Sequence, residues 1–84
     1  MARNIFVIKE FDEFGGVEIY PIAFTSVQAA LDEAEQIAYD KFRNHLMKQV
    51  YVIREEEQVI VERIDRKPYQ TIRRFDIEDW TLIE

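Results

Sequence analysis

One stretch of the chain has the periodicity of an amphipathic helix, and strand-like segments lie on both sides of it. Its apolar residues recur at steps of three and four from Val27 to Phe42, and acidic and polar residues cover the other side. Thr25, followed three residues later by Gln28, has the spacing of a capping box, which makes Thr25 the expected N-cap. We therefore predict one long helix, from about Ser26 to Met47.

The segments outside this helix are rich in Val, Ile, Tyr and Thr, as strands are. They span residues 4–11, 17–24, 49–55, 58–65 and 69–75. Gly15 and Gly16 favour a hairpin turn between the first two. Pro21 favours a sheet edge, or an early end, for the second strand. The first strand is apolar on both faces, so we expect it inside the sheet or in contact with a partner on its second face. We expect the tail, residues 75–84, to form a short helical turn followed by a small strand.

The order of these elements predicts an α+β fold for residues 1–84 as a single domain. We expect one mainly antiparallel sheet of four to five strands, in the order β-β-α-β-β-β, with the long helix packed on one face. The alternative is a β-grasp-like fold, in which the first strand runs parallel to a later one. One helix covers only part of such a sheet, so the second apolar face favours a homodimer or a bound partner.

The residue types needed for catalysis and for metal binding are scarce. The chain has no cysteine, one serine (Ser26, at the helix start), one histidine (His45) and no glycine-rich phosphate loop. We therefore expect no enzymatic activity, no cofactor and no metal site. No apolar run approaches the 18 residues of a membrane span, and the first residues do not resemble a secretory signal. We therefore expect a cytoplasmic protein that does not associate with a membrane.

Acidic residues are in excess and are clustered. Eleven Lys and Arg against 17 Asp and Glu give a net charge of −6, which disfavours general nucleic-acid binding. We predict that two acidic clusters contact a protein with a basic surface, with two aromatic residues as anchors. The predicted partner-binding residues are Phe14, Glu55, Glu56, Glu57, Asp76, Glu78, Asp79 and Trp80.

Basic residues gather around the turn expected between the strands 58–65 and 69–75, and they form a candidate nucleic-acid contact. The candidate residues are Arg63, Arg66, Lys67, Tyr69, Arg73 and Arg74. The competing interpretation is that carboxylates such as Glu62 neutralise these cations across the sheet.

The small size, the acidic charge, the absence of cysteine and the clusters Glu55-Glu56-Glu57 and Asp76-Ile77-Glu78-Asp79 resemble phage-encoded inhibitors of host defences, including anti-CRISPR proteins. This resemblance implies a stoichiometric inhibitor that acts as a nucleic-acid mimic. Such an inhibitor would occupy the basic nucleic-acid-binding surface of a host defence protein in the host cytoplasm. Two alternatives remain open: a homodimeric accessory module, and nucleic-acid contact through residues 63–74.

Overall fold

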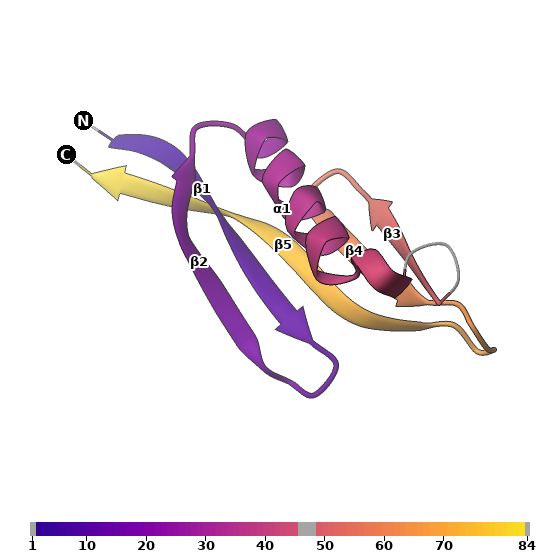
Figure 1. The fold of residues 1–84 in the computed structure, drawn as a ribbon. Helices are drawn as coiled ribbons and strands as arrows, with labels where there is room; N and C mark the ends of the chain where they lie inside the picture. Colours follow the sequence, from indigo (N-terminus) through magenta and orange to yellow (C-terminus); the bar gives the residue numbers. More distant parts are fainter. Residues whose placement is uncertain (1, 46–48, 84) are drawn as a thin grey trace.

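The computed structural model describes residues 2–45 and 49–83, which form one antiparallel sheet with a helix across one face (Figure 1). The strand order is β2-β1-β5-β4-β3, and every pairing is antiparallel. The predicted α+β fold is therefore confirmed, and the β-grasp alternative is wrong because both neighbours of β1, β2 and β5, run antiparallel to it. The elements are β1 (Ala2–Asp12), β2 (Val17–Phe24), α1 (Val27–Lys41), the 3₁₀ turn η1 (Arg43–His45), β3 (Val50–Arg54), β4 (Gln58–Arg63) and β5 (Gln70–Ile83).

The helix begins one residue later than the capping box indicates. Ser26, not Thr25, is the N-cap, and its hydroxyl accepts a hydrogen bond from the backbone N–H of Ala29 at 3.1 Å. The helix ends at Lys41 and is followed by the 3₁₀ turn, so it is shorter than predicted. Met47, the predicted end, lies outside the described residues.

The prediction for the tail is wrong, because β5 continues without interruption to Ile83. Its register runs from Asp12↔Arg73 to Ala2↔Ile83, so β1 pairs with the tail along nearly its whole length. A short segment such as 77–80 has little conformational preference of its own, and pairing with a neighbouring strand decides its structure.

The core lies between α1 and one face of the sheet. Its largest fully buried side chains are Phe75, Ile8, Leu31, Val59 and Val61. Three phenylalanines at positions 6, 24 and 42 pack against this core. Tyr51 does not join this core: it is 52% exposed, because Val50 and Val52 take the inward positions of β3.

The strands are offset along the sheet. Pairing with β4 reaches only as far as Asp76 on β5, and pairing with β2 reaches only Phe6 on β1. Within the described residues, the ends of β1 (residues 2–5) and β5 (residues 80–83) therefore pair only with each other. We call this pair the terminal ribbon; it extends beyond the helix, with both chain ends at its tip (Figure 1).

Candidate functional site

The fold brings the two predicted acidic clusters together. Glu55, Glu56 and Glu57 form the exposed turn between β3 and β4, as predicted. This turn lies against the middle of β5, where the backbone N–H of Ile77 donates to the carbonyl of Glu57 at 3.0 Å. We call the combined surface the acidic edge; it comprises Glu55, Glu56, Glu57, Asp76, Glu78 and Asp79.

A cavity of about 690 Å³ opens at the acidic edge. It is lined by the three glutamates of the turn, by Gln58 and by Ile77. Its walls are therefore acidic, and Ile77 contributes an apolar surface. Such a lining suits a cationic side chain with an aliphatic stem.

The part of the acidic edge on β5 differs from the prediction, because Asp76, Glu78 and Asp79 lie in a continuous strand and not in a short helical turn. Asp76 pairs with Arg74 at 3.0 Å, and Glu78 pairs with Lys9 at 3.6 Å. Asp79 points to the opposite face and accepts a hydrogen bond from Asn4 at 3.4 Å. Within the described residues, the carboxylates of the acidic edge without an ion pair are Glu55, Glu56, Glu57 and Asp79.

The two predicted aromatic anchors are exposed but far apart, because Phe14 follows the end of β1 whereas Trp80 on β5 pairs with Ile5 near its start. Phe14 is 88% exposed at the turn between β1 and β2, and Trp80 is 43% exposed on the terminal ribbon. The indole N–H of Trp80 donates to Glu78 at 3.1 Å, so this anchor belongs to the acidic edge. In the turn that carries Phe14, Asp12 accepts hydrogen bonds from the backbone N–H groups of Gly16 and Phe14, and these bonds lower the pKa of Asp12.

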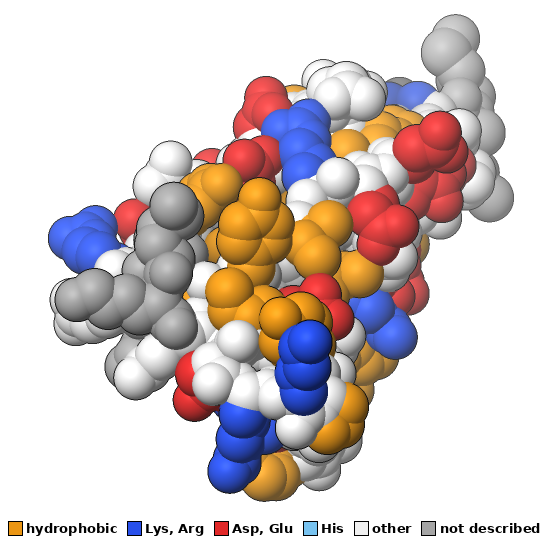
Figure 2. All heavy atoms as spheres, turned by 90° about the vertical axis from the view of Figure 1, so that its right-hand side faces the viewer, with side chains coloured by type: hydrophobic (Ala, Val, Ile, Leu, Met, Phe, Trp, Pro, Cys, Tyr) orange, Lys and Arg blue, Asp and Glu red, His pale blue; other side chains and the backbone are white. Residues whose placement is uncertain are grey.

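The predicted basic surface is largely neutralised, although not by Glu62. Arg63 pairs with Asp65 at 3.5 Å and donates to Gln70 at 2.6 Å. The guanidinium of Arg74 lies 4.4 Å from the centre of the Phe11 ring in addition to its pairing with Asp76. Figure 2 views the molecule from the end of the β4–β5 loop, and Lys and Arg side chains gather in its lower part. Arg66, Lys67 and Tyr69 are exposed in this loop.

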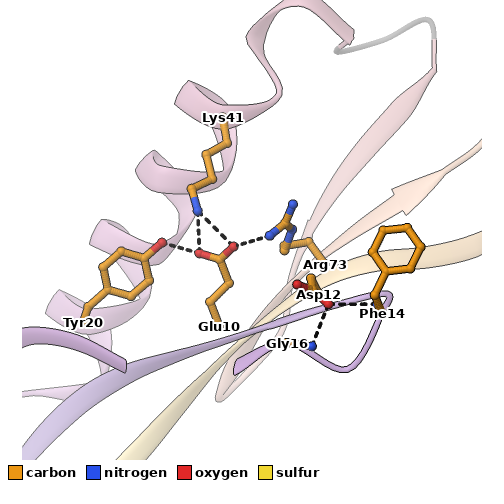
Figure 3. Close-up of polar contacts among 7 residues, drawn as sticks. All are labelled: Glu10, Asp12, Phe14, Gly16, Tyr20, Lys41 and Arg73. Carbon is orange, nitrogen blue, oxygen red and sulfur yellow. Dashed lines mark hydrogen bonds and ion pairs between the residues drawn. The ribbon is translucent and has the colours of Figure 1, made fainter. Parts of the chain in front are cut away.

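A buried polar cluster around Glu10 was not predicted from the sequence (Figure 3). Glu10 is 2% exposed and accepts hydrogen bonds from the Tyr20 hydroxyl, from Lys41 at 2.8 and 2.9 Å, and from Arg73 at 2.7 Å. These donors come from β2, α1 and β5, so the cluster joins three elements to β1. The predicted partner of Arg73 was Glu62 or another carboxylate on the preceding strand, β4, whereas its actual partner is Glu10 on β1, on the other side of β5.

The electrostatics of this cluster favour the ionised carboxylate. Burial by itself would raise the pKa of Glu10, but the hydrogen bonds from Lys41 and Tyr20 and the positive charges of Lys41 and Arg73 outweigh it and lower the pKa. Burial and the hydrogen bond to Glu10 raise the pKa of Tyr20. One signal in the sequence was available: Glu10 shares the strand face of Phe6 and Ile8, so it was placed to point into the core.

Comparisons with known protein families, with curated proteins and with solved structures found no match to this chain. Within residues 2–45 and 49–83, no group of three or more His, Asp or Glu side chains is arranged to hold a metal ion. The described helices also include none that is long and apolar enough to cross a membrane.

Proposed function

We propose that this chain is a non-enzymatic protein-binding module whose acidic edge occupies a basic surface of a partner. The supporting observation is the convergence of the two acidic clusters at the hydrogen bond between Ile77 and Glu57. Four carboxylates of this surface have no ion pair within the described residues, so they are available to cations of another molecule.

The physical roles of charge and anchor differ in this proposal. Each exposed ion pair with a partner contributes about 0.2–1 kcal/mol, and the cluster acts mainly by speeding association and fixing orientation. An aromatic anchor supplies more of the binding energy. Trp80 suits this role better than Phe14, because it lies beside the acidic edge.

The finer form of the proposal is an inhibitor that acts as a nucleic-acid mimic. In this form the partner's basic surface is the nucleic-acid-binding surface of a host defence protein, in the cytoplasm of the cell that a phage infects. The support for it is the resemblance in size and charge, together with the single acidic edge.

The test is a charge reversal of the turn, Glu55→Lys, Glu56→Lys and Glu57→Lys together. A partner is first captured from cell extract with the wild-type chain, and its association rate is then measured at low salt. We expect the triple variant to associate about 10-fold more slowly or worse, with folding intact. The captured partner should also bind nucleic acid in competition with the wild-type chain.

The matched control carries the same change in charge elsewhere, at Glu13, Glu18 and Glu33. None of these has an ion pair within the described residues. We expect the control variant to associate faster than the acidic-edge variant. Equal rates for the two variants would show that only net charge matters, and the proposed site would be rejected.

A homodimeric module is a second candidate, favoured by the sheet face opposite the helix. The register places exposed apolar side chains on this face, among them Val17 (54% exposed), Ile19 (47%) and Tyr51 (52%). Sedimentation equilibrium tests this candidate. A dimer mass that Tyr51→Glu converts to a monomer mass would support it, and a monomer mass for the wild-type chain would exclude it.

A further inference from the structure

In the part of the chain that the structure describes, the edge of β5 next to β4 is unpaired beyond Ile77. The last contact on this side is the hydrogen bond from Ile77 to Glu57, and within the described residues no strand continues in line with β4. Backbone N–H and C=O groups alternate in direction along a strand, so Asp79 and Thr81 direct theirs to the same side as Ile77. Both residues are exposed. Two sets of backbone donors and acceptors therefore face solvent at a position where a strand would fit.

The surroundings of this edge have a definite chemistry. The cavity of the acidic turn lies at its near end, beside Ile77. The carboxylate of Asp79 lies on one face of the strand, and Glu78 and Trp80 lie on the other. An added strand would therefore place alternate side chains near carboxylates on one face and near an indole ring on the other.

We propose that this edge takes up an extended, Lys- or Arg-rich segment of the partner as an added strand in line with β4. The proposal rests on the proposed function and specifies its binding mode. In strand addition, backbone hydrogen bonds hold the segment and alternate side chains determine its specificity. Here the cations would face the cavity and Asp79, and the intervening residues would pack on Trp80.

Charge decides between this segment and a second copy of the chain. Pairing two copies at this edge would bring two acidic edges close together, and like charges placed near each other oppose association. A basic segment has the complementary charge. An exposed edge also attracts unrelated strands unless charge restricts its partners, and the carboxylates here select a cationic one.

The first experiment uses a capped peptide of alternating lysine and valine, about six residues long, the ordinary length of a strand. We expect it to bind the wild-type chain and to slow hydrogen exchange at the backbone N–H groups of Asp79 and Thr81. The control peptide has the same sequence with every backbone nitrogen methylated, which removes the N–H donors on both edges of the strand, and we expect it not to protect these groups. Failure of the first peptide to bind would overturn the proposal.

The second experiment compares Thr81→Pro with Thr81→Ala. Proline removes an N–H that points away from β1, so the β1–β5 pairing is kept, whereas alanine keeps the donor. We expect Thr81→Pro to bind the peptide about 10-fold more weakly or worse, and Thr81→Ala to bind like the wild-type chain. If circular dichroism shows that the proline variant does not fold, the test is the hydrogen exchange of Asp79 and Thr81 in the wild-type chain with the peptide bound. Unslowed exchange there would overturn the proposal.

The outcomes separate this inference from the proposed function. Strand addition would be overturned if Thr81→Pro binds as well as the wild-type chain while the charge reversal of Glu55, Glu56 and Glu57 abolishes binding. The acidic binding surface would then remain in place. Binding that is unaffected by the charge reversal would overturn the basic character of the segment. A wild-type dimer that Thr81→Pro dissociates would assign the edge to a second copy and would also overturn the proposal.

Discussion

Among the residues that the structure describes, Glu10 makes the most buried polar contacts. Its carboxylate is buried, but Lys41 and Arg73 keep 39% and 30% of their side chains exposed. Replacing the carboxylate leaves both cations unpaired, although each can still reach water. The resulting loss is therefore smaller than the roughly 3–5 kcal/mol typical of a fully buried pair that loses one partner.

We expect Glu10→Gln to lower the free energy of unfolding by about 2 to 3 kcal/mol, measured by urea denaturation. Tyr20→Phe removes one hydrogen bond and leaves the ion pairs, and it should cost about 1 kcal/mol. A cost for Glu10→Gln no larger than that for Tyr20→Phe would show that the two ion pairs contribute nothing to stability.

The pH dependence of stability follows from the lowered pKa of Glu10, whose ordinary value is 4.5. The unfolded chain binds a proton at this group more readily than the folded chain does, so the contribution of Glu10 is present above pH 4.5 and is lost as pH falls below it. We expect the wild-type chain to lose stability as pH falls from about 4.5 through the lowered pKa of Glu10. Glu10→Gln should lose less over this range, and parallel pH profiles would contradict the assignment.

At the scale of the elements, the start of α1 distinguishes two candidate caps. The sequence favours Thr25, whereas in the structure the Ser26 hydroxyl accepts the hydrogen bond from Ala29. We expect Ser26→Ala to cost about 1 kcal/mol in thermal or urea unfolding, and Thr25→Ala to change stability by less than about 0.5 kcal/mol. The reverse order of costs would restore Thr25 as the cap.

The strands show why local sequence predicted some structural features correctly and others incorrectly. The turn at residues 55–57 and the edge position of β2 were predictable, because charged residues and Pro21 act locally. The continuation of β5 through residues 76–83 was not, since it depends on pairing with β1, more than sixty residues earlier.

At the scale of the whole molecule, the protein is elongated, with overall dimensions of 50 × 22 × 19 Å, and the two ends of its sheet differ in the number of strands that support them. The terminal ribbon has two strands, and a two-stranded ribbon by itself is only marginally stable. Asp76 and Trp80 both lie on β5 and pair with Lys9 and Ile5 of β1, but only Asp76 also has β4 beside it. The two positions should therefore differ in local stability.

We expect the backbone N–H of Trp80 to exchange with solvent on the order of 10-fold faster or more than that of Asp76. Native-state hydrogen exchange measured by NMR tests this directly. Equal protection at the two positions would mean that the terminal ribbon opens only when the whole sheet unfolds.

The sequence by itself determined the α+β fold class, the one helix, the turns and the positions of the acidic clusters along the chain. These features follow from periodicity and from turn residues, which act over a few neighbouring positions. Only the tertiary structure decided the strand order, the pairing of Glu10 with Arg73 and the meeting of Glu57 with Ile77. Each of these contacts joins residues distant in the chain, and such contacts depend on which strands become neighbours when the helix and sheet bury their apolar faces.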